Sequence, residues 1–223
     1  IRENRQSTFQ RVNVAGTQNM VSAARDTGVK RFIHMGILGA SPDPRYTYLH
    51  SKWLGMEAVR NSGLNYSILQ PSVMFGQGAG FIASLLRSIH MLPFIVPLAG
   101  DGKSRLQPIW VGDVVSCVMK MVSGEKSGES CTVGGPEIMT YEAMLDQILA
   151  ALGEKRLKIH VPRPLMLPAV AVMGRLFSNP PISMAEFKSM EIENTTDADA
   201  VQKQFGFKPM ALRDGLDYLK LKS

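Results

Sequence analysis

The sequence lacks several features that would define a function class. Its two cysteines, Cys117 and Cys131, have no C-x-x-C spacing, which argues against a metal site and predicts two buried free thiols. No apolar run approaches the roughly 18 residues that cross a bilayer, so we expect no transmembrane segment. No signal-peptide pattern is visible either, which favours a cytoplasmic protein.

Clustered positive charge is also missing. Lysine and arginine outnumber aspartate and glutamate by 25 to 19, giving a formal net charge of +6, but no run of five basic residues occurs. Aromatic residues make up only 7% of the chain and do not alternate with basic ones, as a surface that stacks bases would require. We therefore expect no nucleic-acid partner.

A third absence concerns phosphate binding. A dinucleotide site uses a strand, a G-x-x-G-x-x-G turn and a helix to direct backbone N–H groups at the pyrophosphate. The glycine-rich stretch 76–80 follows the wrong strand for this, and Gly134-Gly135-Pro136 is typical of a turn. We expect this chain on its own to bind a dinucleotide poorly.

The hydrophobic pattern predicts an α/β protein with a doubly wound, Rossmann-like parallel sheet and a smaller C-terminal α/β region. Residues 1–76 are assigned to the sheet and residues 77–223 mainly to a substrate-binding region, with 106–122 returning to the sheet. The predicted helices are 8–27, 48–61, 81–91, 113–122, 140–152, 164–178, 183–192, 197–204 and 211–221, and the predicted strands are 30–35, 65–70, 93–99, 106–111, 130–133 and 155–161.

One helix has two interpretations. Residues 165–177 are apolar on nearly all sides. They form either a buried helix of the substrate region or a surface for a quinone-like ligand, a membrane face or a protein partner.

Tyr48 and Lys52 stand four residues apart at the start of a predicted helix, so both side chains share one face. An ammonium close to a phenol stabilises the phenolate and lowers the phenol's pKa. The pair can then exchange a proton with a carbonyl oxygen while a reduced nicotinamide delivers hydride. The motif alone is weak, because Tyr218 and Lys222 match it at the C-terminal end, where we expect a solvated helix end.

Several stretches, in the order in which they follow one another along the chain, resemble the extended short-chain dehydrogenases/reductases, which are the NAD-dependent epimerase/dehydratase-like group. The later ones are similar to an atypical branch that includes the nucleotide-binding accessory subunit of respiratory complex I. The resemblance covers essentially the whole chain. The stretches are 13–17, 29–35, Tyr48 with Lys52, 70–76, 109–115, 133–141 and Asn179-Pro180-Pro181-Ile182.

The resemblance implies roles for particular residues. Tyr48 would be the general acid/base, and Lys52 its partner and a ligand of the nicotinamide ribose. The backbone of Pro71, Ser72 and Val73 would line the nicotinamide end of an NADP or NAD site. Asn13 would support the active site from the preceding helix, and Asp113 would cap a helix of the substrate half.

Two departures from the family pattern put catalysis in doubt. Gly36 stands where the family has Ser or Thr, whose hydroxyl bonds the substrate oxygen, and losing such a donor costs about 2.7–4 kcal/mol. Ser41 could substitute for that hydroxyl only from the following loop, and Gln70 replaces a usual arginine.

The resemblance also implies that a first βαβαβ half of roughly 70–90 residues precedes this chain. Without that half, one edge of the sheet is expected to be exposed.

Two functions follow from the resemblance. The first is an oxidoreductase or epimerase-like enzyme that acts on a small, apolar or quinone-like substrate. The second is an NADPH-binding scaffold or assembly factor with a protein-complex partner, cytoplasmic or peripheral to a membrane. Gly36 favours the scaffold, whereas the intact Tyr48/Lys52 pair favours the enzyme.

Overall fold

A three-stranded parallel sheet organises the first part of the molecule. The computed structural model describes residues 3–4, 6–92, 94–124, 128–177, 180 and 182–222, with the backbone alone at 220–222. Strands β1 (Phe32–Met35), β2 (Tyr66–Pro71) and β7 (Glu129–Val133) lie in the order β1-β2-β7. Ile68 and Leu69 of β2 point to opposite faces and both are fully buried, as expected of a parallel sheet covered on both sides.

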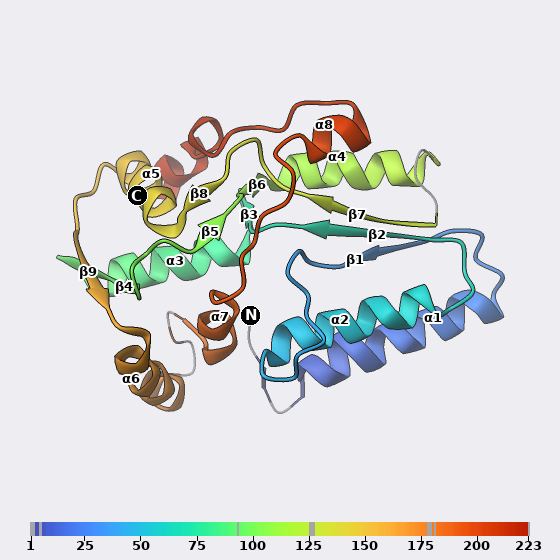
Figure 1. Ribbon diagram of the computed structural model, residues 1–223, viewed down its shortest axis with the longest axis horizontal. Helices are drawn as coiled ribbons and strands as arrows, with labels where there is room; N and C mark the ends of the chain where they lie inside the picture. The colour runs from blue at the N-terminus through green and yellow to red at the C-terminus, as the bar shows by residue number, and fades with distance from the viewer. Residues whose placement is uncertain are drawn as a thin grey trace.

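Helices cover both faces of this sheet (Figure 1). Helices α1 (Gly16–Asp26) and α2 (Thr47–Arg60) pack on one face, and α4 (Val111–Val122) and α8 (Ala200–Phe205) on the other. The expected α/β fold with parallel strands is therefore present. Within the described part of the chain β1 pairs only with β2, so its other edge has no partner strand.

The remaining elements form a second packed region beside the sheet. Its apolar core joins α3 (Gly80–Met91), α5 (Tyr141–Leu152) and the C-terminal turns. Its strands pair as β4 (Ile95–Ala99) with β9 (Leu157–Val161), β3 (Met74–Phe75) with β6 (Ile109–Trp110), and β5 (Arg105–Leu106) with β8 (Met139–Thr140). The remaining helical segments are α6 (Arg163–Leu176), α7 (Met184–Ser189) and two 3₁₀ segments, Leu212–Gly215 and Asp217–Lys222.

The strand predicted over residues 106–111 is wrong. It is divided into β5 and β6, and neither strand pairs with the β1-β2-β7 sheet. Pro108 has no N–H to donate to a ladder. The Gln107 side chain bonds the Gly135 carbonyl at 2.7 Å and the Thr196 N–H at 2.7 Å, which fixes the chain between the two short strands. The strand that joins the sheet from this region is β7, and α4 packs on the sheet as a helix.

The ends of several helices also differ from the prediction. The helix predicted over 211–221 consists of the two 3₁₀ segments, and the first helix begins as a π-helical stretch, Gln10–Ala15. By contrast, Thr140 caps α5 as predicted, because its hydroxyl accepts a hydrogen bond from the Ala143 N–H at 3.1 Å. The two cysteines are buried free thiols, as expected.

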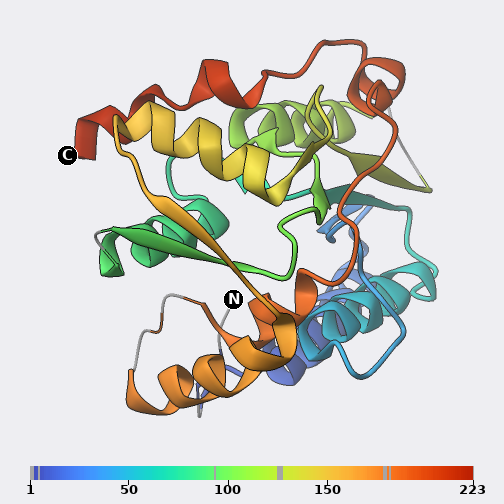
Figure 2. The ribbon, with the colours of Figure 1, turned by 60° about the vertical axis from the view of Figure 1, so that its left-hand side comes forward.

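Helix α6 lies at the outside of the molecule (Figure 2), which contradicts the interpretation as a buried helix. Val170 is its only buried residue, while Leu165 and Leu176 are 68% and 74% exposed. Among the described residues no helix is long and apolar enough to cross a membrane.

Three parts of the sequence motifs lie outside the described residues. They are Asn179, Pro181 and the Lys222 side chain.

Two helical segments approach each other closely at one glycine. They are the π-helical stretch Gln10–Ala15 and helix α2, which carries Tyr48 and Lys52. A Cβ added to Gly55 of α2 would lie 2.6 Å from the backbone oxygen of Asn13. Backbone atoms cannot move aside as a flexible side chain can. Gly55 therefore sets the distance between α2 and the π-helical stretch before α1.

We expect Gly55→Ala to destabilise the protein by about 1–3 kcal/mol, because the added methyl group overpacks this contact. The melting temperature should fall by ~2–4 °C for each kcal/mol, measured by calorimetry.

Gly174→Ala is the matched control, because nothing lies within 4 Å of its added Cβ and Gly174 is inside helix α6. It should leave stability unchanged or raise it by up to about 1 kcal/mol. Equal losses in the two variants would contradict the close-contact explanation.

Candidate active site

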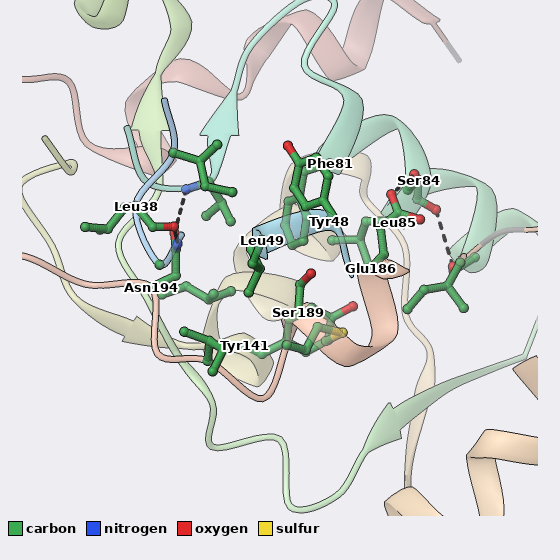
Figure 3. Close-up of a pocket in the computed structure, with 18 residues that line it drawn as sticks. Leu38, Tyr48, Leu49, Phe81, Ser84, Leu85, Tyr141, Glu186, Ser189 and Asn194 are labelled. Atoms are coloured by element: carbon green, nitrogen blue, oxygen red, sulfur yellow. Dashed lines mark hydrogen bonds between the residues drawn. The ribbon is translucent and has the colours of Figure 1, made fainter. Parts of the chain in front are cut away.

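Tyr48 lies in the first turn of α2, at the wall of a cavity of about 130 Å³. The loops that follow β1 and β2 contribute Leu38 and Val73 to the same wall (Figure 3). Parallel α/β sheets bind ligands outside the carboxyl ends of their strands, and the cavity is at that place. Tyr48 and Val73, the latter in the loop that begins at Pro71, line the same cavity.

The electrostatics of Tyr48 differ from the prediction. Burial, with a smaller contribution from the Glu186 carboxylate, raises the pKa of Tyr48 to about 12. The Phe9 ring lies 5.3 Å from the Tyr48 ring, centroid to centroid, and adds to this burial. The predicted lowering of the phenol's pKa by Lys52 is therefore wrong in this structure, and the phenol stays protonated at neutral pH.

Lys52, one helical turn further along α2, interacts electrostatically with His34 of β1. Burial lowers the pKa of Lys52. Burial and the charge of Lys52 together lower the pKa of His34 to about 4. Among the described residues the buried His34 Nε2 atom has no hydrogen-bond partner, and such a buried polar atom calls for an explanation.

Asn13 contacts α2 and is not among the residues that line the cavity, so its predicted support of an active site stays a prediction. Its Nδ2 atom donates to the Ser51 hydroxyl at 2.9 Å, and that hydroxyl donates to the Tyr48 carbonyl at 2.7 Å. A short chain of hydrogen bonds therefore connects the π-helical stretch to the turn of α2 that holds Tyr48 and Lys52.

Gly36 lies at the end of β1 with its missing side chain directed toward α2. An added Cβ would be 2.5 Å from the Met56 sulfur and 3.2 Å from the Cγ atom of Gln70. The space for a hydroxyl-bearing side chain is thus filled by these two residues. Among the described residues Ser41 does not line the cavity; its hydroxyl accepts a hydrogen bond from the Asp43 N–H at 3.1 Å.

The loop Pro71-Ser72-Val73 is fixed by a residue that sequence reasoning missed. The Asn194 Oδ1 atom accepts the Ser72 hydroxyl at 2.6 Å and the Val73 N–H at 2.8 Å. Its Nδ2 atom donates to the Leu38 carbonyl at 2.8 Å, as drawn in Figure 3. The predicted backbone contacts of this loop with a cofactor stay a prediction, since the Val73 N–H is already donated within the chain.

Two other residues of the sequence motifs have structural contacts. Asp113 does not cap α4 at its N-terminus; it is buried in the first turn and its Oδ2 atom accepts the Met210 N–H at 2.7 Å. Burial raises the pKa of Asp113 although this hydrogen bond lowers it. The Tyr218 hydroxyl accepts the Gly76 N–H at 3.3 Å, so it packs against the chain rather than ending in solvent.

A parallel sheet covered by helices, with a cavity at the carboxyl ends of its strands, defines a Rossmann-type α/β protein. The model of the NAD dependent epimerase/dehydratase family matches residues 2–134. The chain belongs to that family.

Similar proteins carry different functional names. Subunit 9 of the mitochondrial NADH dehydrogenase 1 alpha subcomplex from Arabidopsis thaliana is 25% identical over 73% of this chain and 41% of its own length. A 3beta-hydroxysteroid-dehydrogenase/decarboxylase from the same plant is 23% identical over 92% of this chain and 43% of its own length. The chain thus spans less than half the length of these two relatives.

Solved structures share the fold at low identity. The NADPH-dependent quinone oxidoreductase from Escherichia coli has a TM-score of 0.71 at 14% identity and covers 92% of this chain and 70% of its own. UDP-glucuronic acid 4-epimerase from Bacillus cereus has a TM-score of 0.70 at 17% identity and covers 100% of this chain and 72% of its own.

The low pKa of His34 predicts a pH dependence of stability. A histidine whose folded pKa lies below its unfolded value of about 6.5 stabilises the fold fully above that value. The contribution is lost as the pH falls from 6.5 toward 4 and amounts to about 3 kcal/mol at most. Urea unfolding at pH 7 and pH 4.5 should show this loss, and His34→Leu should reduce it.

Lys52→Met tests the cause of that shift. Removing the positive charge should raise the pKa of His34, as followed by the NMR signal of its imidazole. An unchanged titration would mean that burial alone sets the pKa.

The Asn194 contacts predict a local effect. Asn194→Ala leaves the Ser72 hydroxyl, the Val73 N–H and the Leu38 carbonyl without these bonds, which should cost about 2–4 kcal/mol. Amide hydrogen exchange at Val73 should accelerate by more than about tenfold. Asn61→Ala, at the exposed end of α2, is the control and should change stability by less than about 0.5 kcal/mol.

Proposed function

We propose that the protein is an NAD(P)-dependent oxidoreductase or epimerase-like enzyme in which Tyr48 exchanges a proton with the substrate oxygen. The observation that carries this proposal is the position of Tyr48 in the cavity wall, between the loops that follow β1 and β2. Asn13 and Ser51 hold its backbone in place. Lys52 lies one turn away, where it can contact the cofactor.

The raised pKa of Tyr48 favours one direction of the reaction. A phenol with a pKa of about 12 is protonated at neutral pH, so it is equipped to donate a proton to a carbonyl oxygen as the carbonyl is reduced. The reverse reaction would need the phenolate, which burial and Glu186 disfavour. Tyr48 would therefore serve as a general acid in carbonyl reduction, giving an alcohol.

The polar groups beside α2 fit the nicotinamide end of NADP or NAD. The Lys52 ammonium has three N–H donors and can donate to ribose hydroxyls. The cofactor, when bound, supplies the hydride. Pro71, Ser72 and Val73 would line the nicotinamide end mainly through their backbone, apart from the Val73 N–H, which donates to Asn194.

A second candidate function is a non-catalytic NADPH-binding scaffold or assembly factor for a respiratory or quinone-linked complex. Met56 and Gln70 fill the place beside Gly36 where a substrate-binding hydroxyl would stand. The relatives named as NADH dehydrogenase subunits support the same candidate. A protein-complex partner or a peripheral membrane position would use the exposed apolar face of α6.

Tyr48→Phe distinguishes the two candidates. In the full-length protein we expect NADPH oxidation with carbonyl substrates to fall by about 10²–10⁴-fold, because the general acid is removed. Cofactor oxidation is followed by absorbance, and cofactor affinity by titration.

Tyr218→Phe is the matched control, because Tyr218 begins the second Y-x-x-x-K match and contacts Gly76 outside the cavity wall. It should keep full activity. Tight NADPH binding without turnover, identical in the wild type and Tyr48→Phe, would support the scaffold instead.

A further inference from the structure

A second cavity lies next to the one beside Tyr48. It has a volume of about 70 Å³, and α3, β4, α6 and α7 contribute to its wall. Four methionines line it, which are Met91, Met166, Met173 and Met190. Among its described lining residues none carries a charge, and the hydroxyl groups are those of Ser88 and Tyr141. This cavity therefore favours apolar ligand surface over a hydrated one.

The two cavities share part of their walls. Ser88, Tyr141, Ile182 and Met190 line both of them. One layer of side chains thus separates the space beside Tyr48 from the methionine-lined space. Figure 3 shows Tyr48 and Tyr141 among the residues around the first cavity. Met190 can move aside without a change of the backbone, because its side chain has three rotatable bonds.

The shared wall offers little polarity to a ligand. The Ser88 hydroxyl donates to the Ser84 carbonyl at 3.3 Å within α3. Burial is the largest of the effects that raise the pKa of Tyr141 to about 12, so its phenol is uncharged at neutral pH. Glu186 lines the first cavity and is not among the described residues that line the second. A hydrocarbon chain that has passed this wall therefore contacts no charged side chain of the described lining.

Helix α6 covers the second cavity from the outside of the molecule (Figure 2). Met166, Val170 and Met173 follow one another at spacings of four and three residues, so they share one face of α6. Val170 is 1% exposed, and the two methionines line the cavity. The inner face of this nearly all-apolar helix therefore serves as a wall of the second cavity.

The size of the second cavity limits the shape of its ligand. Its volume is about half of the roughly 150 Å³ of an engineered apolar cavity that binds benzene. A six-membered ring does not fit there, whereas an unbranched alkyl chain is narrow enough to enter. The first cavity, at about 130 Å³, has more room and holds the end of the ligand that meets Tyr48.

We infer that the two cavities form one binding site for a carbonyl compound with an unbranched alkyl tail. The carbonyl group lies at Tyr48, and the tail passes Tyr141 and Met190 into the methionine-lined cavity. This inference rests on the proposed function, because it takes the reacting carbonyl to lie next to Tyr48. Each methylene group of the tail that is buried strengthens binding by up to about fourfold.

Methyl ketones of increasing length test the inference. Dissociation constants of 2-butanone, 2-hexanone, 2-octanone and 2-decanone are measured by NMR on the full-length protein without cofactor. Methyl labels on Leu49 and Val73 report on the first cavity, and labels on Met166 and Met173 report on the second. We expect 2-butanone to shift only the first pair of signals and 2-octanone to shift both pairs. The affinity should rise by up to about fourfold per methylene group and level off once the tail fills the second cavity.

Ala99→Leu narrows the second cavity, because Ala99 lines it from β4 and is not among the described residues that line the first. The affinity for 2-octanone should fall by at least about tenfold, and that for 2-butanone should change by less than about twofold. Ala171→Leu adds the same side chain at an exposed position of α6 outside the described lining of both cavities, and it is the control. It should change neither affinity.

Met173→Ala tests the same cavity from the side of α6 and decides the question if Ala99→Leu does not fold. The substitution lengthens the space for the tail, so the affinity for 2-decanone should rise relative to that for 2-octanone. An unchanged ratio would contradict a tail that lies against Met173.

Equal affinities for 2-butanone and 2-octanone in the wild type would overturn the inference, as would 2-octanone binding without a shift at Met166 and Met173. Because these affinities are measured without cofactor or turnover, they do not depend on whether Tyr48 is catalytic. Loss of turnover in Tyr48→Phe combined with unshifted Met166 and Met173 signals would reject the tail site and keep the enzyme. Shifts at both methionines with full turnover in Tyr48→Phe would reject the proposed role of Tyr48 and keep the tail site.

Discussion

Three hydrogen bonds of the Asn194 side chain hold the candidate active site together. They connect Leu38, in the loop after β1, with Ser72 and Val73, in the loop after β2. Parallel pairing places the ends of β1 and β2 side by side, and the Leu38 N–H still donates to the Pro71 carbonyl at 2.9 Å beyond the end of β1. At Ser72 and Val73 the side-chain contacts to the loop after β1 come from Asn194, more than a hundred positions later, so this part of the cavity wall also depends on the packing of the C-terminal segment.

The proton chemistry of the site is decided by a competition around Tyr48. Lys52 would stabilise a phenolate, whereas burial and the Glu186 carboxylate stabilise the phenol. Burial dominates, and the charge of Lys52 acts mainly on His34. Spacing along a helix shows that two side chains share a face, but it does not show which other charges lie across the cavity. Burial therefore decides the sign of the pKa shift, and Glu186 of α7, from a distant part of the sequence, adds to it.

The sequence predicts the local features of this protein well. Alternating helices and strands predict the parallel sheet, and the Thr140 cap follows from one residue type at one position. The sequence predicts the structure poorly where hydrogen bonds between distant residues replace regular strand pairing. The Gln107 side chain bonds Gly135 and Thr196 and so divides what the sequence predicts as one continuous strand. The hydrophobic pattern of the sequence does not indicate these two contacts. Asn194 likewise stands in no motif, and its role follows only from the loops that it joins.

Gly36 shows how a departure from the family pattern is accommodated by packing. With no side chain at the end of β1, Met56 and Gln70 extend into the vacated space, and Met56 is 1% exposed. Methionine suits such a gap because its flexible thioether adapts to irregular shapes. The substrate oxygen would then have Tyr48 as its main hydrogen-bond donor, and a single donor with a high pKa must remain protonated to act. The raised pKa of Tyr48 thus favours proton donation over proton removal, whereas the filled space beside Gly36 favours the scaffold.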